Sequence, residues 1–380
     1  MRNPFETEER AAFRESIARF VENEVKPFAD DWDEAGGIPW ELHRKVAELG
    51  AFGFGIDEAY GGLGFDDCFM RSAYAEEFGR CGATGVFTAV NTRMISTGPI
   101  AELASEEIRQ RVLPPVLAGE KLSCLAITEP SAGSDVANIK TTARRDGDDY
   151  VLNGSKTFIS GGTRAEFFVV GARTGGEGLT GISLFLVERG MEGFSDVPLD
   201  RKMGWWCSDQ ATLFFEDVRV PAASMIGAEH RGFIAIMENF NLERLAMVAA
   251  ALGMMKECLD YSVAYAGERQ TFGKRLIEHQ VIRHKIAEMS ARIDAVEALL
   301  NQVCWLWNEG EKPVAEICKA KFFTTKALEY CASEAMQILG GAGYLRGNPV
   351  ERIYREVKVM AIGGGSEEIM RDLAVRQMGL

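Results

Sequence analysis

Residues 240–255 read Phe-Asn-Leu-Glu-Arg-Leu-Ala-Met-Val-Ala-Ala-Ala-Leu-Gly-Met-Met. At helical spacing this stretch is apolar on nearly every side, which predicts a helix buried inside a bundle. Glu243 falls on the same side as Ala246 and Met247, where an isolated charge would cost several kcal/mol. Two interpretations follow. Glu243 forms a buried ion pair, with Arg244 or another cation, or it is a general base whose pKa is raised by the loss of water.

Composition and charge narrow the classes of protein to which this chain can belong. Its 380 residues suggest two or three domains, and its net charge of −14 argues against nucleic acid or an anionic membrane surface as a partner. The eight cysteines form no Cys-x-x-Cys pair, which predicts reduced core thiols, and the four histidines lack the spacing of a zinc site. No stretch of about 18 uncharged apolar residues exists, so no membrane insertion is expected. With no visible targeting sequence, a cytoplasmic location is expected.

The first 118 residues predict helices and no strand. Thr7, followed by two glutamates, is expected to cap the first helix, which should end near Pro27. Further helical patterning is expected over residues 39–49, 66–79 and 84–118.

Between residues 119 and 227 the pattern changes from helical to short alternating segments. These segments are rich in β-branched and aromatic residues and are bounded by turn residues, so they are expected to be antiparallel strands. They cover residues 122–128, 140–145, 150–153, 157–160, 167–172, 182–187 and 212–215. So many short strands predict a small barrel or sandwich.

Helical patterning returns after residue 228. Apolar residues alternate in steps of four and three from Ile282 to Val303, as in the seam of a helical bundle. Another helix should follow Pro313, and Ser366 is expected to cap the last one. The sequence therefore predicts an α+β chain with a helical domain (1–118), a β domain (119–227) and a four-helix bundle (228–380).

The chemistry is not that of the common nucleotide or hydrolase motifs, because the Rossmann, P-loop, nucleophile-elbow and His-Glu-x-x-His patterns are all missing. Four polar, glycine-containing clusters remain as candidate sites: 126–135, 153–160, 269–280 and 337–344. Phe158 and Ser160 should share one face of a strand, which suits a flat heterocycle. Arg269, Lys274 and Arg275 would suit a diphosphate. Each cluster also has a plain structural alternative: a turn, a core aromatic, a solvated loop or a helix C-cap.

Taken together, these clusters resemble the acyl-CoA dehydrogenase family of flavoenzymes over essentially the whole chain. The most specific stretches are Thr128–Asp135 and Gln337–Arg355, with Arg269–Gly273 and Gln280 as a third match. The resemblance implies an N-terminal helical domain, a central β-barrel and a C-terminal four-helix bundle, with FAD between barrel and bundle. It further implies a homotetramer, or dimer of dimers, and electron-transfer flavoprotein as electron acceptor.

The resemblance also assigns site residues by position. Those expected to bind FAD are Ile127, Thr128, Gly133, Ser134, Phe158, Ser160, Arg269, Thr271, Phe272, Gln280, Gln337, Gly341, Ser366 and Glu368. Within this set, the residues from Arg269 to Gly341 should hold the diphosphate and adenosine half of an FAD bound mainly by a neighbouring subunit. The residues expected to contact the acyl-CoA are Ser134, Asn241, Arg244 and Gly364.

The position of the catalytic base separates members of this family. Many carry a glutamate near the C-terminus, where this chain has Gly364. A minority, typified by isovaleryl- and long-chain acyl-CoA dehydrogenases, carry this glutamate in a Leu-Glu-Arg-Leu sequence on a bundle helix. Residues 242–245 of this chain have that sequence. The resemblance therefore favours Glu243 as the base.

The activity implied by this placement is the α,β-dehydrogenation of an acyl-CoA thioester to the trans-2-enoyl-CoA. Glu243 would take the α-proton and flavin N5 would receive the hydride. Side chains near Glu243, namely Ala246, Met247, Ala250 and Met254, would admit a branched or bulky acyl chain. Three alternatives stay open: an enoyl-CoA reductase resembling crotonobetainyl-CoA reductase, an oxygen-using acyl-CoA oxidase or flavin N-hydroxylase, and a non-enzymatic CoA-binding protein.

Overall fold

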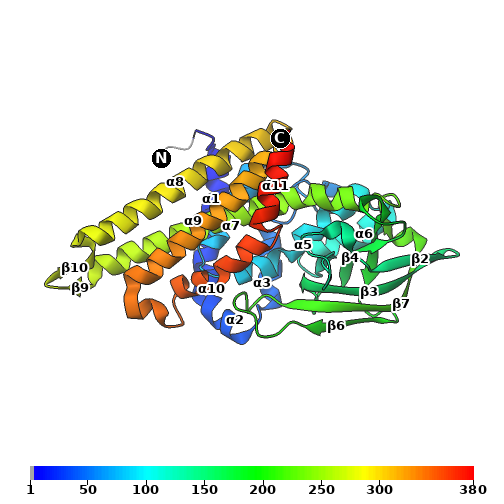
Figure 1. Cartoon of the computed structure of the whole chain (residues 1–380), viewed down its shortest axis with the longest axis horizontal. Coiled ribbons are helices and arrows are strands. Elements are labelled where there is room, and N and C mark those ends of the chain that lie inside the picture. The colour runs from blue at the N-terminus through cyan, green and yellow to red at the C-terminus, as the bar shows by residue number, and fades with distance from the viewer. Residues whose placement is uncertain (1–3) are drawn as a thin grey trace.

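Helix α7 (Gly232–Glu268) is the element around which the rest of the chain packs. The computed structural model describes residues 4–380, and in it α7 runs from the sheet toward the opposite end of an elongated molecule (Figure 1). The stretch 240–255 lies within this helix, and every residue from Val248 to Met255 is buried. The prediction of a buried bundle helix is therefore confirmed.

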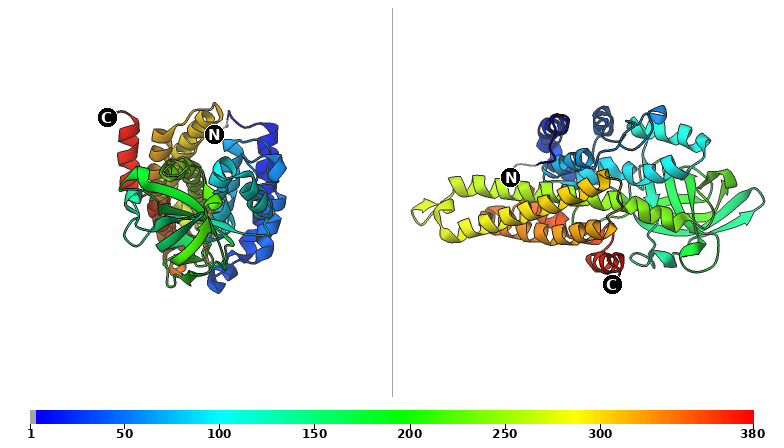
Figure 2. Two further views of the ribbon diagram at one scale, coloured as in Figure 1. Left: turned by 90° about the vertical axis from the view of Figure 1, so that its right-hand side faces the viewer. Right: turned by 90° about the horizontal axis from the view of Figure 1, so that it is seen from above.

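Helices cover α7 on two sides, as the two further views show (Figure 2). The N-terminal helices are α1 (Glu8–Phe20), α2 (Ala29–Ala35), α3 (Trp40–Glu48), α4 (Cys68–Gly79), α5 (Thr84–Leu103) and α6 (Glu106–Leu117). The C-terminal elements are the hairpin β9 (Gln270–Thr271) and β10 (Lys274–Arg275), then α8 (Gln280–Asn308), α9 (Val314–Leu339), α10 (Pro349–Ile362) and α11 (Glu367–Gln377). None of the helices within residues 4–380 combines the length and apolar character needed to cross a bilayer.

The helix ends follow the capping residues in the sequence. The Thr7 side chain accepts a hydrogen bond from the backbone N–H of Arg10, and Ser366 caps α11 by accepting from Ile369. The first helix does not run unbroken to Pro27. It ends at Phe20 and continues as a π-helical turn, Val21–Val25.

The central domain is a single eight-stranded sheet. Its strands are β1 (Ser123–Ala126), β2 (Thr142–Asp146), β3 (Asp149–Ser160), β4 (Phe167–Arg173), β5 (Ile182–Glu188), β6 (Phe194–Pro198), β7 (Gln210–Pro221) and β8 (Met225–Ile226). They pair in the order β6-β7-β3-β2-β4-β5-β8, with β1 beside β4. Because β6 and β8 at the two ends do not pair with each other in the described part of the chain, the sheet is open and the expected barrel is not closed.

The strand predictions need three further corrections. The two segments expected at 150–153 and 157–160 are one strand, β3, which carries register shifts where it pairs with β7. β1 pairs with β4 in parallel rather than antiparallel, because alternation along a strand does not specify the direction of its neighbour. β6 was not expected: it is short, mostly exposed and ends in Pro198, as suits an edge strand.

The sheet and the helices enclose separate cores that meet at the start of α7. Inside the curved sheet, Phe168, Phe185 and Phe215 are almost fully buried. On its outer side, Ile236 of α7 approaches Gly171 of β4, where an added Cβ would lie 3.8 Å from the isoleucine methyl. The sheet therefore rests on the N-terminal end of the central helix.

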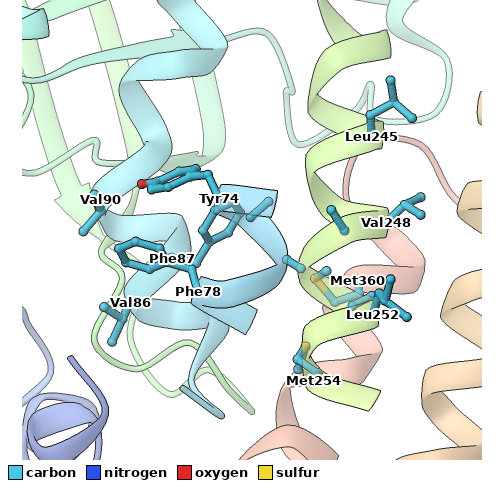
Figure 3. Close-up of a cluster of buried hydrophobic side chains, with 14 of the residues drawn as sticks. Tyr74, Phe78, Val86, Phe87, Val90, Leu245, Val248, Leu252, Met254 and Met360 are labelled. Atoms are coloured by element: carbon cyan, nitrogen blue, oxygen red, sulfur yellow. The ribbon is translucent and has the colours of Figure 1, made fainter. Parts of the chain in front are cut away.

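Helices α4 and α7 touch backbone to backbone. A Cβ added at Gly253 would lie 2.0 Å from the Glu76 carbonyl oxygen, and one added at Gly79 would lie 2.1 Å from that of Ala250. Around this contact, side chains of α4, α5 and α7 form one buried apolar cluster (Figure 3). Close contact at these two glycines fixes the distance between α4 and α7, the helix that carries Glu243.

Candidate active site

A cavity of about 1290 Å³ opens where the sheet, α5, α7 and the loop before α11 meet. A pocket for one drug-sized ligand holds roughly 300–1,000 Å³, so this cavity has room for a cofactor and a substrate together. Ten of the predicted site residues line it: Ile127, Thr128, Gly133, Ser134, Phe158, Ser160, Glu243, Arg244, Gly364 and Ser366.

Glu243 faces this cavity from α7 without a partner. Its Oε2 atom is buried and has no hydrogen-bond partner, and neither carboxylate oxygen forms an ion pair, among residues 4–380. Burial raises the pKa of Glu243 to about 7, while the charges of Arg244 and Lys321 act in the opposite direction. The geometry is therefore that of a desolvated carboxylate and differs from the ion pair that the sequence left open.

Arg244 is turned toward the C-terminal loop instead of toward Glu243. Its Nε donates to the carbonyl oxygen of Gly364 at 2.9 Å, and one terminal nitrogen donates to Asn241 Oδ1 at 3.1 Å. Asn241 is buried behind the arginine and does not line the cavity. In this structure Asn241 orients Arg244 and lies away from the space available to an acyl-CoA.

The sheet presents a polar edge to the other side of the cavity. Behind it, the fully buried Lys156 donates to the Ile127 carbonyl oxygen at 3.0 Å and to Glu129 Oε1 at 2.7 Å. Burial lowers the pKa of Lys156 to about 8, and Glu129 acts in the opposite direction. The ion pair holds the segment that carries Thr128, whose carbonyl oxygen accepts from the backbone N–H of Thr157.

Phe158 offers a flat apolar surface beside this edge. It has a positive φ of 59°, at the register shift in β3, and 69% of it is exposed. Ser160, which also lines the cavity, accepts a hydrogen bond from Gln210 at 3.3 Å, and Lys202 in turn donates to Gln210 at 2.6 Å. An uncovered aromatic ring beside hydroxyl groups fits a planar, hydrogen-bonding ring system such as flavin.

From Glu243 the cavity extends between α4 and α5. Its walls there include Tyr74, Phe87, Thr88 and Asn91, and the Tyr74 hydroxyl donates to Asn91 Oδ1 at 2.8 Å. Ala246 and Met247 also line the cavity. The expectation that Ala250 and Met254 do so is wrong, because both are buried in the packing between helices.

The remaining predicted residues lie away from the cavity. Arg269, Thr271, Phe272 and Gln280 belong to the β9–β10 hairpin and the start of α8, at the end of the bundle away from the sheet (Figure 1). Gln337 and Gly341 lie at the C-terminal end of α9, and Glu368 is exposed on α11. Phe272 has 97% of its surface exposed at a positive φ of 49°. Within one chain these residues are not assembled with the cavity.

Two buried lysines near the cavity were missed by the reading of the sequence. Lys156 supports the sheet edge, and Lys321 of α9 donates to the carbonyl oxygen of Gly365 at 2.6 Å. The sequence indicates that each lysine is buried, since Lys321 follows Ile317 and precedes Thr324 on an apolar helix face and Lys156 lies within a strand. The sequence does not indicate their partners, because Lys321 binds a loop and Lys156 binds a strand end that are distant in the chain.

Comparisons with known proteins support one family. Residues 7–120, 124–218 and 230–379 match the acyl-CoA dehydrogenase N-terminal, middle and C-terminal domains. The chain is 34% identical to the mitochondrial long-chain specific acyl-CoA dehydrogenase of Rattus norvegicus, over 97% of this chain and 86% of that protein. It is 36% identical to the acryloyl-CoA reductase (NADH) of Anaerotignum propionicum, over 98% and 95%.

A solved structure agrees over the whole fold. The crystal structure of a probable acyl-CoA dehydrogenase from Mycobacterium abscessus superposes with a TM-score of 0.95, at 42% identity, covering 98% of this chain and 99% of that chain. The resemblance inferred from the sequence motifs is therefore confirmed, together with the FAD that the family uses. This chain belongs to the acyl-CoA dehydrogenase family of FAD-dependent oxidoreductases.

Proposed function

We propose that the protein removes a proton and a hydride from an acyl-CoA thioester to form the trans-2-enoyl-CoA, with Glu243 as the base for the α-proton. The observation that carries this proposal is the unpartnered, buried Glu243 carboxylate facing a cavity large enough for two ligands. Such a carboxylate has lost the water that would otherwise stabilise its charge, so it binds a proton more tightly than an exposed glutamate does.

Other residues of the chain would bind FAD and stabilise the thioester oxygen. FAD bound against Phe158, Thr128 and Ser160 would supply the acceptor for the two electrons that leave with the β-hydrogen. Glu243 takes the α-proton from the side of α7, opposite the sheet edge. The backbone N–H of Gly364 is the proposed donor to the thioester oxygen, where negative charge develops as the proton leaves. Enclosure between sheet and bundle would exclude water. The exclusion of water would make the Glu243 carboxylate more basic and strengthen the hydrogen bond from Gly364 to the thioester oxygen.

A second subunit is part of the proposal. The predicted diphosphate and adenosine contacts, from Arg269 to Gln280 and at Gln337 and Gly341, lie at the far end of the bundle, and all of the named residues except the half-buried Thr271 are exposed. They would complete the site of a neighbouring chain in a homotetramer, or dimer of dimers. Electron-transfer flavoprotein is the proposed acceptor of the electrons.

A reductase is the second candidate, because one relative at 36% identity is an acryloyl-CoA reductase (NADH). The same site would then run in reverse, with the protonated Glu243 returning a proton to the α-carbon. The direction depends on the electron partner, which the cavity does not specify. An acyl-CoA oxidase or N-hydroxylase would instead form peroxide or a hydroxylated product with oxygen.

One titration separates these functions. The purified protein is mixed anaerobically with short, branched, medium and long acyl-CoAs while the visible flavin spectrum is followed. Bleaching by one class supports dehydrogenation and identifies the substrate class. A flavin that no acyl-CoA bleaches, but that is reoxidised by an enoyl-CoA after chemical reduction, would support the reductase. Protein that cannot be reconstituted with FAD would contradict both.

A further inference from the structure

The loop Gly363–Gly365, between α10 and α11, forms one wall of the cavity beside Glu243. The backbone N–H of Gly363 is tied to the Val359 carbonyl oxygen at 2.8 Å. Gly364 and Gly365 both have positive φ, of 64° and 102°. Glycine adopts this backbone conformation readily, but two unrestrained glycines would also populate many other conformations. Contacts from the rest of the protein must therefore select the conformation of this loop.

Two buried cations bind successive carbonyl oxygens of this loop. Arg244 Nε lies 2.9 Å from the oxygen of Gly364, and Lys321 Nζ lies 2.6 Å from the oxygen of Gly365. Arg244 is 4% exposed and Lys321 is fully buried. The pair comes from two different helices, α7 and α9, so the loop is bound to both of them.

Two N–H groups of the same loop, those of Gly364 and Gly365, are available to a ligand. Within residues 4–380, neither Gly364 nor Gly365 donates its backbone N–H to another protein atom. Because a trans peptide places N–H and C=O on opposite sides, binding the Gly364 carbonyl to Arg244 turns the N–H of Gly365 away from the guanidinium. A cation on the carbonyl side also polarises the peptide and strengthens its N–H as a donor.

Lys321 has no other partner that would explain its burial. Its Nζ makes this single hydrogen bond among the described residues, although an ammonium has three donors. The nearby Glu367 is already bound by Thr325 at 3.0 Å, and by Lys326 and Arg371. Burial lowers the pKa of Lys321 to about 8, with Arg244 acting in the same direction and Glu367 and Glu243 against it. Burying an ammonium with a single hydrogen bond lowers the stability of the fold. A neutral side chain could fill the same space without that loss of stability, so stability alone does not explain a lysine here.

We propose that Lys321 is a positioning residue for α-proton removal. Together with Arg244 it fixes the Gly363–Gly365 loop so that the free N–H groups of Gly364 and Gly365 meet the thioester oxygen of the bound acyl-CoA. The inference rests on the proposed function, because it names the support of the group that stabilises the developing enolate oxygen.

The test replaces Lys321 with methionine, which keeps the length of the side chain and removes the ammonium. Lys319→Met is the matched control, since Lys319 is on the same helix, is 40% exposed and pairs only with Glu316 among the described residues. Removing one oxyanion donor costs roughly 10²–10³-fold in rate, so a displaced donor should slow flavin reduction by roughly 10–100-fold. Acyl-CoA binding should change by less than about threefold, because in this proposal the loop would contact the acyl-CoA only at its thioester oxygen.

A second readout does not depend on turnover. Para-dimethylaminocinnamoyl-CoA absorbs at longer wavelength when its carbonyl is polarised, so its spectrum on the FAD-containing enzyme reports the N–H donors directly. The shift should be large in the natural protein and in Lys319→Met, and much smaller in Lys321→Met. Lys321→Gln, which retains an N–H donor without the charge, should lie between them.

Three results would each overturn a specific part of the reasoning. Equal red shifts and equal reduction rates in Lys321→Met and the natural protein would overturn the role of Lys321 and leave the dehydrogenase proposal intact. A natural protein that no acyl-CoA reduces would overturn the proposed function, while the spectral shift would still test the loop. Loss of folded, FAD-containing protein in both Lys321 variants would assign the lysine to stability alone and overturn the inference.

Discussion

Replacement of Glu243 with glutamine should strongly slow substrate oxidation and stabilise the fold. The substitution keeps the size of the side chain and removes its ability to take the α-proton. A positioned general base contributes roughly 10²–10⁴-fold, equivalent to about 3–5 kcal/mol of activation free energy, so flavin reduction should slow by at least about 100-fold.

The effect on stability has the opposite sign, and its magnitude follows from the structure. The pKa of Glu243 is about 7 in the folded chain against an ordinary 4.5. The folded state therefore binds the proton more tightly than the unfolded state, so this group lowers stability progressively as pH rises from about 4.5 through about 7. The full difference corresponds to about 3 kcal/mol, an upper value because the residue is partly open to the cavity. Glutamine carries no such penalty.

The assay combines anaerobic stopped-flow reduction of the flavin with thermal unfolding at two pH values. Glu243→Gln should have a higher Tm than the natural protein at pH 8, and the difference should become much smaller at pH 5. Glu238→Gln is the matched control, because Glu238 lies on the same helix, is 55% exposed and is paired with Lys312. It should leave rate and stability nearly unchanged. A Glu243→Gln protein that acyl-CoA reduces within about threefold of the natural rate would refute the role of the base, and a Tm lowered at pH 8 would refute the unpartnered carboxylate.

Three further predictions follow from the same site. The profile of kcat/KM against pH should rise through a midpoint near 7, because only ionised Glu243 accepts a proton and kcat/KM reports groups of the free enzyme; a flat profile from pH 5 to 8 would contradict this. Lys156→Met should lower the free energy of unfolding by about 3 kcal/mol and reduce FAD content, measured by denaturant unfolding and by absorbance, because it leaves the buried Glu129 carboxylate with its backbone N–H donors but without its cation. Phe87→Ala should raise kcat/KM for bulky acyl-CoAs relative to short ones, since Phe87 lines the cavity between α4 and α5; an unchanged ratio would place the acyl chain elsewhere.

The sequence identified elements whose signal is local. The helix around Glu243, the cap at Thr7 and the seam from Ile282 to Val303 follow from periodicity and capping chemistry, and all are present. Strand pairing depends on contacts distant in sequence, so the parallel pairing of β1 and the open edge at β6 were not predicted.

The same division applies to the site. A buried carboxylate is conspicuous in an apolar helix, so Glu243 could be singled out from its neighbours alone, but its role as the base was assigned from the family resemblance. Lys321 could not be assigned a partner, because the oxygen that it binds belongs to Gly365, on a loop 44 positions away. Ala250 and Met254 were misplaced for a related reason. Helical spacing gives the side of α7 on which they lie, but the depth at which α4 packs against that side depends on Gly79 and Gly253.

That contact between glycines also limits how this protein can be re-engineered or can diverge. A methyl group at Gly253 would overlap the backbone of α4, which unlike a side chain cannot rotate away. The distance between the two helices therefore cannot accommodate a larger residue at either glycine, and we expect acyl specificity to change through residues that face the cavity. A mutagenesis library should leave Gly79 and Gly253 untouched and vary positions such as Phe87, Asn91 and Met247.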